Sequence, residues 1–190
     1  MKKHDYWVYK NRFTHNELEL MGEVALTRGR LDDSKDQCDG KDTESYWTNA
    51  LQEVPFLAEF KDHCINEVKD NFGYDIDASY TKEFLLNIYH EGSNGYPWHV
   101  DGHQVPHNDI KMTCIINASL EPYRGGSLYL AAARLPDEPV PELEQPGNVI
   151  VFRSNILHKV SPILIGQRRS LVMFFSGPNC KFFKFCVNEA

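Results

Sequence analysis

The chain has 190 residues and a formal net charge of −7, and its composition, 42% hydrophobic and 12% aromatic, is that of an ordinary globular protein. This length favours one domain with a full core, and no apolar run is long enough to span a bilayer. The acidic side chains are concentrated in the first half of the chain. A protein that grips a nucleic-acid backbone normally shows a basic surface, so a nucleic-acid partner is not expected.

The amino terminus and the cysteines indicate the cellular compartment. The first residues are positively charged but lack the apolar stretch of a signal peptide. Five cysteines, without a C-x-x-C pair, suit a reducing compartment and argue against a zinc ribbon or a disulfide framework. Cys38, Cys64 and Cys114 are expected to be free; Cys180 and Cys186 could meet through one turn, with the reduced state as the default. We therefore expect a cytoplasmic protein, and the lack of heptads or a self-complementary stripe predicts a monomer.

Two helices are predicted in the first half of the chain. Thr14-x-x-Glu17 is a capping box, and the apolar spacing that follows it predicts a helix near residues 15–28. Pro55 suits the first turn of a second helix, and Gly73 ends it. Between them, apolar residues recur every four positions: Phe56, Phe60, Cys64, Val68 and Phe72. This stripe is typical of a helix that packs against a sheet.

Short β-rich runs separated by turn residues dominate the chain after Tyr80, and one more precedes the first helix. The runs are Tyr6–Tyr9, Glu83–Tyr89, Lys111–Asn117, Ser127–Ala131, Asn148–Phe152, Leu157–Val160, Leu171–Ser176 and Phe182–Val187. They favour a double-sheet jelly roll over a βαβ fold. We predict a mainly β fold with flanking helices, a double-stranded β-helix (jelly roll) packed against N-terminal helices. One domain would span residues 1–190, with helical support in 1–79 and the jelly-roll core in about 80–178.

The candidate metal ligands begin with His99-x-Asp101. Residues two apart on a strand point to the same face, about 6–7 Å apart, so both side chains can converge on one ion. One later histidine would complete the 2-His-1-carboxylate triad of non-heme Fe(II) sites. His158 is the only histidine after His107, so it is the candidate. Because H-x-D is a short motif that also arises by chance, His107-x-Asp109 competes with the earlier pair.

Arg168 follows His158 by ten residues. If the segments that begin at Leu157 and Arg168 form an antiparallel hairpin across the Pro162–Gly166 bend, His158 and Arg168 share one face. A fixed guanidinium beside a metal suits a dicarboxylate co-substrate, which chelates the metal at one end and pairs with arginine at the other. Strand alternation lets only one of two neighbours face inward, and the spacing selects Arg168 over Arg169.

With these residues the sequence resembles the Fe(II)/2-oxoglutarate dioxygenases, and within them the prolyl 4-hydroxylase-like group that includes the oxygen-sensing prolyl hydroxylases. The resemblance covers about residues 82–177, and the matching pieces are Tyr89-x-x-Gly92, His99-x-Asp101, GGSLYL from Gly125, His158, Pro162 and Gly166-x-Arg168-x-Ser170. It implies Fe(II) held by His99, Asp101 and His158. It also implies 2-oxoglutarate, held by Arg168, and O2 as co-substrates, with ascorbate in a supporting role.

Further roles follow from this resemblance and from the motif's neighbours. Tyr89 becomes a hydrogen-bond donor to 2-oxoglutarate, although its pattern alone fits a core tyrosine on a strand equally well. Ser170 could support the ligand of Arg168 through its hydroxyl group. Tyr96 and Trp98 flank the metal motif, and we predict that they form the pocket wall near the prime substrate.

Two features depart from the family's pattern. Asp32–Glu44 carries six acidic residues and two lysines, which is typical of a solvated loop. Together with the strand after it, this loop is similar to the mobile loop that covers the active site of the oxygen sensors. The family's loop carries an arginine, where this chain offers Gln37 and Cys38. Asn117 stands where several relatives place a tyrosine that binds the co-substrate.

The resemblance implies an Fe(II)- and 2-oxoglutarate-dependent dioxygenase that hydroxylates prolyl residues of a protein or peptide. Asp101 favours hydroxylation, since related halogenases lack this carboxylate so that chloride can bind. One alternative is a small-molecule hydroxylase or an alkylation-repair-like demethylase, which Asn87-x-Tyr89 fits, although those relatives place the key arginine farther beyond the last histidine. The other is a non-catalytic or zinc-binding jelly-roll module. Arg168 argues against it, because a structural metal needs no carboxylate clamp nearby.

Overall fold

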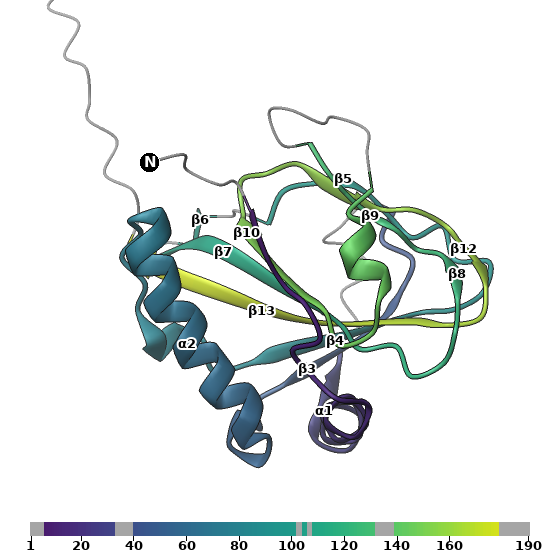
Figure 1. Cartoon of the computed structure of the whole chain (residues 1–190), viewed down its shortest axis with the longest axis horizontal. Helices are drawn as coiled ribbons and strands as arrows, with labels where there is room; N and C mark the ends of the chain where they lie inside the picture. The colour runs from purple at the N-terminus through teal and green to yellow at the C-terminus, as the bar shows by residue number, and fades with distance from the viewer. Residues whose placement is uncertain (1–5, 33–39, 102–103, 106–107, 132–138, 179–190) are drawn as a thin grey trace, which may run out of the picture.

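The computed structural model describes residues 6–32, 40–101, 104–105, 108–131 and 139–178. The predictions for Gln37, Cys38, His107, Cys180, Cys186 and a strand over Phe182–Val187 lie outside these residues. The described part of the chain forms two facing β-sheets, and two helices lie on the side of the larger sheet that is turned away from the smaller one (Figure 1).

Every strand pair in the described residues is antiparallel. The large sheet contains, in spatial order, β1 (Tyr6–Tyr9), β10 (Val149–Arg153), β7 (Asn108–Asn117), β13 (Arg168–Pro178), β4 (Phe84–Tyr89), β3 (Glu44–Thr48) and β2 (Arg30–Leu31), with β6 (Gln104–Val105) paired to β7. The small sheet contains β5 (Tyr96–His99), β11 (His158–Val160) and β9 (Leu128–Leu130). A separate ribbon pairs β12 (Ile163–Ile165) with β8 (Arg124–Gly125). The predicted mainly β architecture with flanking helices is confirmed.

Both predicted helices form with the expected ends. In α1 (His15–Arg28) the Thr14 hydroxyl accepts from the backbone N–H of Glu17 at 3.4 Å, and the Glu17 carboxylate accepts from the backbone N–H of Thr14 at 2.7 Å. Helix α2 (Pro55–Phe72) begins with proline and ends at Gly73, whose φ of 69° is left-handed. Short 3-10 turns are η1 (Leu51–Glu53), η2 (Ala78–Tyr80) and η3 (Pro141–Glu144). Within the described residues, neither helix is long and apolar enough to cross a membrane.

Strand alternation divides the apolar interior into two clusters. On β13, Leu171, Met173 and Phe175 pack with the predicted apolar stripe of α2. Their neighbours Val172 and Phe174 point to the other side, toward the small sheet. Because successive strand residues face opposite sides, the large sheet presents one face to the helices and the other to the space between the sheets.

The predicted hairpin between the His158 and Arg168 segments does not form. Strand β11 pairs with β5 and β9, whereas β13 pairs with β4 and β7. The connecting residue Ile163 donates its N–H to Ser93 and accepts from the N–H of Gly92. These bonds direct the connection across the molecule, so His158 and Arg168 lie on opposite sheets.

Candidate functional site

A cavity of about 530 Å³ is lined by residues of both sheets. Directly paired residues of antiparallel strands point to the same face, so the cavity residues of the large sheet form rows that run across its strands. Three of these rows follow one another along β4 and β13. The distal row holds Tyr89 and Arg168, and the middle row holds Ser45, Asn87 and Ser170. The apolar row holds Trp47, Leu85, Val172 and Ile115. The lining of the cavity therefore changes from a cationic row at Arg168, through a polar row, to an apolar row.

His99, Asp101 and His158 gather at one wall of this cavity. Each offers one ligand atom, and the three atoms lie within 4.8 Å of one another. His99 and His158 are paired across β5 and β11. The Nε2 atoms of His99 and His158 lie 3.6 and 3.4 Å from the two Asp101 oxygens. Among the described residues this is the only group of three such side chains placed to hold a metal ion, and its composition fits a facial Fe(II) triad.

The second nitrogen of each histidine ring is held by the backbone. Nδ1 of His99 lies 2.8 Å from the carbonyl oxygen of Pro97, and Nδ1 of His158 lies 2.9 Å from that of Ile156. A proton on Nδ1 leaves the lone pair of Nε2 directed at the ligand cluster. Burial lowers the pKa of each histidine to about 4, and at His99 the charge of His158 adds to this effect. Both rings are thus neutral near pH 7, as metal ligands must be.

The carboxylate of Asp101 is anchored to the large sheet. Thr113, fully buried on β7, donates its hydroxyl to Oδ2 of Asp101 at 2.7 Å. The backbone N–H of Asp101 donates to the carbonyl of Ser154 at 3.0 Å. The two histidines come from the small sheet, so this arrangement ties the cluster to both sheets. Sequence reasoning missed Thr113, since no motif marks it and only the register of β7 turns it toward Asp101.

The distal row ends in a buried cation. Arg168 is 1% exposed, and its Nε and Nη1 atoms have no hydrogen-bond partner among the described residues. Its guanidinium carbon lies 5.4 Å from the ring centre of Tyr89, its direct partner across β4 and β13. Burial raises the pKa of Tyr89 to about 12, so its hydroxyl remains a donor. A buried cation with unused N–H groups is costly, and these residues fit an anion in the cavity.

The two residues predicted to wall the substrate pocket take different places. Tyr96 lines the cavity and stacks on His99, with ring centres 3.5 Å apart. Trp98 is not among the lining residues; it is 37% exposed, and Nζ of Lys159 lies 4.7 Å from its ring centre. A bulge in β5 places Tyr96 and His99 on one face. Trp98, the neighbour of His99, points to the other face and does not line this cavity.

Asn117 is paired with Ser170 across β7 and β13 and shares its face, but it is not among the residues that line the cavity. Its amide nitrogen donates to the Tyr123 hydroxyl and to the carbonyls of Leu143 and Glu144, at 3.0, 2.8 and 3.1 Å. Its amide oxygen accepts from the backbone N–H of Ser119 at 3.1 Å. These bonds occupy the whole side chain, which fastens the η3 segment to β7.

The mouth of the cavity is bordered by the described ends of the charged loop. Arg30, Asp32 and Lys41 line it. Oδ2 of Asp32 accepts from Nε1 of Trp47 at 3.2 Å, and Nζ of Lys41 lies 5.6 Å from the ring centre of Tyr96. The segment that resembles an active-site cover therefore meets the cavity at both of its described ends.

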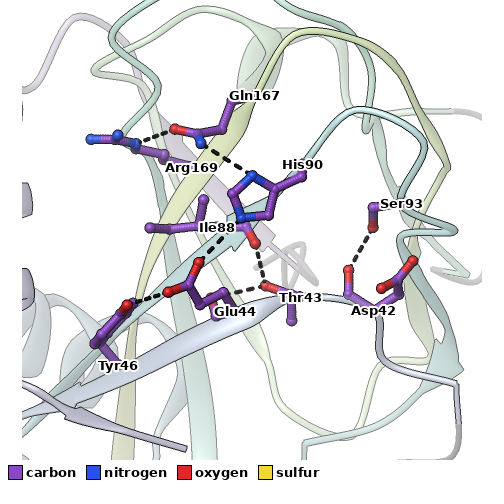
Figure 2. Close-up of polar contacts among 9 residues, drawn as sticks. All are labelled: Asp42, Thr43, Glu44, Tyr46, Ile88, His90, Ser93, Gln167 and Arg169. Atoms are coloured by element: carbon purple, nitrogen blue, oxygen red, sulfur yellow. Dashed lines mark hydrogen bonds and ion pairs between the residues drawn. The ribbon is translucent and has the colours of Figure 1, made fainter.

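Figure 2 shows a chain of polar contacts that runs from β3 past the end of β4 to the start of β13. Its members are sequence neighbours of the cavity residues Ser45, Tyr89 and Arg168, so strand alternation turns them to the opposite face. The Tyr46 hydroxyl donates to the Glu44 carboxylate, whose other oxygen lies 3.2 Å from Nε2 of His90. Nδ1 of His90 lies 3.4 Å from Nε2 of Gln167, and Oε1 of Gln167 accepts from Nε of Arg169 at 2.7 Å. The bond from Tyr46, followed by that from His90, lowers the pKa of Glu44. These contacts link β3, β4 and β13, the three strands that also present Ser45, Tyr89 and Arg168 to the cavity.

No family model matches the chain. A PKHD-type hydroxylase of Synechococcus sp. (strain CC9605) is 34% identical to it over 87 residues, which are 44% of this chain and 37% of that protein. The match thus spans little more than a third of the length of this curated relative.

Solved structures of prolyl hydroxylases share the fold. The 2-oxoglutarate complex of the viral collagen prolyl hydroxylase of Paramecium bursaria Chlorella virus-1 superposes with a TM-score of 0.67 at 14% identity, covering 92% of this chain and 97% of that one. A prolyl-4-hydroxylase of Pseudomonas putida gives 0.69 at 15% identity, covering 93% and 94%. The predicted jelly roll is confirmed, and it is the fold of 2-oxoglutarate-dependent prolyl hydroxylases.

Proposed function

We propose that this chain is an Fe(II)- and 2-oxoglutarate-dependent dioxygenase that hydroxylates prolyl residues of a protein or peptide. The observation that carries the proposal is one cavity with His99, Asp101 and His158 at one wall and the buried Arg168 at its distal end, whose Nε and Nη1 have no hydrogen-bond partner among the described residues. The triad leaves open positions on Fe(II). The guanidinium offers a bidentate, charge-assisted contact to a carboxylate at the far end of the same ligand.

When bound, iron, 2-oxoglutarate and O2 supply the oxidising chemistry: one oxygen atom enters succinate as CO2 is lost, and the other enters a substrate C–H bond. The residues of the chain bind and orient. His99, Asp101 and His158 would hold the metal, and Arg168 would pair with the distal carboxylate of the co-substrate. Tyr89 remains protonated beside Arg168 and can donate to the same carboxylate. Between these ends the cavity is lined first by the polar middle row and then by the apolar row.

The substrate proposal rests on the similarity to prolyl hydroxylases and on the aromatic side chains that line the cavity. The relatives include a collagen prolyl hydroxylase and a prolyl-4-hydroxylase. In this chain Trp47 and Phe174 line the cavity with ring centres 6.0 Å apart, and Tyr96 lines it from the small sheet. Such aromatic surfaces suit the apolar ring of a proline.

We also propose that residues 1–190 act as one domain and as a monomer, in the cytoplasm. Residues before 80 supply β1, β2 and β3 of the large sheet together with both helices that cover it, which supports a single folding unit. Cys64 and Cys114 are free and buried, as suits a reducing compartment.

The function is tested by anaerobic titration of the Fe(II) protein with 2-oxoglutarate, followed by a succinate assay in air. We expect a metal-to-ligand charge-transfer band, and succinate formation that rises with proline-containing peptides. Free amino acids and methylated nucleotides serve as competing substrate classes. If the protein binds metal but shows no band, the oxygenase proposal fails and a metal-binding module remains.

A further inference from the structure

Asn87 is a buried amide in the middle row of the cavity, between the Arg168 end and the apolar row. It is 5% exposed on β4, and it lines the cavity together with Leu85 and Tyr89, two residues to either side. Strand alternation accounts for this direction. A buried amide is unfavourable unless it is hydrogen-bonded, so its partners show which of its atoms is available to a ligand.

Ser45 fixes the orientation of this amide. The Ser45 hydroxyl, 4% exposed on β3, donates to Oδ1 of Asn87 at 2.7 Å. Within the described residues this is the only acceptor of that hydroxyl, so a flipped amide would leave the hydroxyl without one. Since Oδ1 of Asn87 is bonded to Ser45, the NH2 group is the part of the amide left for a ligand in the cavity, and no acceptor in the described part of the chain bonds to it.

The free NH2 group stands next to the proposed anion subsite. Ser170 is paired with Asn87 across β4 and β13, and it lines the cavity too. Arg168, two residues before Ser170 on the same face, contributes its unpartnered Nε and Nη1. Three side chains with hydrogen-bond donors thus surround the stretch of cavity that a ligand must cross to reach both the metal triad and Arg168.

Asn117, which also belongs to the middle row, has no free hydrogen-bond donor for a ligand. It pairs with Ser170 at the other end of the middle row, but its own amide is fully used in hydrogen bonds inside the protein. We propose that Asn87, oriented by Ser45, donates a hydrogen bond to bound 2-oxoglutarate and serves as the neutral donor that Asn117 cannot be. This inference rests on the proposed function.

The test compares 2-oxoglutarate affinity in four variants, by the charge-transfer titration and by the thermal shift of the Mn(II)-loaded protein. Asn87→Ala should weaken binding about tenfold, the loss of one hydrogen bond to a charged group. Asn87→Asp keeps the shape but sets a carboxylate beside the dicarboxylate ligand, and should weaken binding more than about 100-fold. Ser45→Ala should give an intermediate loss, because the amide is then free to rotate. Asn94→Asp makes the same change in an exposed loop residue, and should leave affinity unchanged.

Two further readouts separate binding from general damage. Mn(II) affinity without 2-oxoglutarate should stay within about threefold of the wild type, because Asn87 is not a ligand of the triad. In turnover, Asn87→Ala should raise KM for 2-oxoglutarate more than it lowers kcat. If the wild type binds 2-oxoglutarate and Asn87→Ala binds it equally well, the inference is wrong and the proposed function stands. If the wild type does not bind it, the proposed function itself fails. Should Asn87→Asp not fold, Asn87→Ala and Asn87→Ser carry the decision.

Discussion

Replacement of Arg168 by methionine should change ligand affinity and protein stability in opposite directions. Methionine fills a similar volume without the charge. Because Arg168 is 1% exposed and two of its N–H donors lack partners, a bidentate pair with 2-oxoglutarate would form in a desolvated site. Its loss should cost about 2–4 kcal/mol, or roughly 30- to 1000-fold in affinity.

The same substitution should not weaken the fold when 2-oxoglutarate is missing. A buried guanidinium with unused donors destabilises the protein, and an apolar replacement of similar volume is often neutral or stabilising by about 1–4 kcal/mol. The Tm of Arg168→Met without 2-oxoglutarate should therefore equal or exceed that of the wild type. Added 2-oxoglutarate should raise the Tm of the wild type only, since a ligand stabilises the state that it binds.

The assay is an anaerobic charge-transfer titration with Fe(II), run beside thermal unfolding with and without 2-oxoglutarate. Arg169→Met is the matched control, because Arg169 lies on the opposite face and bonds to Gln167; its affinity should change less than about threefold. Metal binding should survive in both variants. Equal losses of affinity in the two, or a Tm of Arg168→Met well below that of the wild type, would refute the assignment of Arg168 as an anion receptor.

Four other outcomes are expected. Thr113→Val should lower Mn(II) affinity roughly 10- to 100-fold, because the Asp101 carboxylate loses its hydrogen bond from the hydroxyl. Thr113→Ser keeps the hydroxyl and should keep the wild-type affinity; a Thr113→Val protein with wild-type affinity would show that the bond is dispensable. His99→Ala should lose the metal and His107→Ala should keep it, and the reverse result in equilibrium dialysis would point to the second H-x-D motif. The pKa of Tyr89 is raised to about 12 by burial, so the stability that depends on its neutral form is complete below the unfolded value near 10 and is lost as pH rises toward 12. Urea unfolding at pH 8 and 11 should therefore show a larger decline for the wild type than for Tyr89→Phe, and parallel declines would contradict it. Light scattering should report a monomer at all concentrations, and a stable dimer would contradict this prediction.

The features that sequence reasoning placed well depend on local chemistry. Helix α1 begins where Thr14 and Glu17 cap each other, and α2 ends where Gly73 adopts a left-handed conformation. These signals act over a few residues and work in any tertiary setting. The H-x-D pair is local in the same sense, because the spacing of His99 and Asp101 along the chain keeps them close together.

The features that it missed depend on pairing between distant segments. A hairpin was a reasonable expectation for His158 and Arg168, yet their strands join different sheets and face each other across the cavity. Trp98 was assigned to the pocket because it flanks the metal motif, but it follows strand alternation and lies on the face opposite His99, whereas a bulge in β5 brings Tyr96 onto the face of His99. Thr113 carries no motif and reaches Asp101 only through its place on β7.

The sequence by itself determined the fold class, both helices, and the residue types from which a metal triad and an anion receptor could be built. The tertiary structure decided which of those residues share a cavity. The physical reason is the alternation of strand side chains: one bulge or one change of partner moves a side chain to the other face. Long-range backbone hydrogen bonds, such as those of Ile163 to Gly92 and Ser93, set the pairing, and no local pattern encodes them.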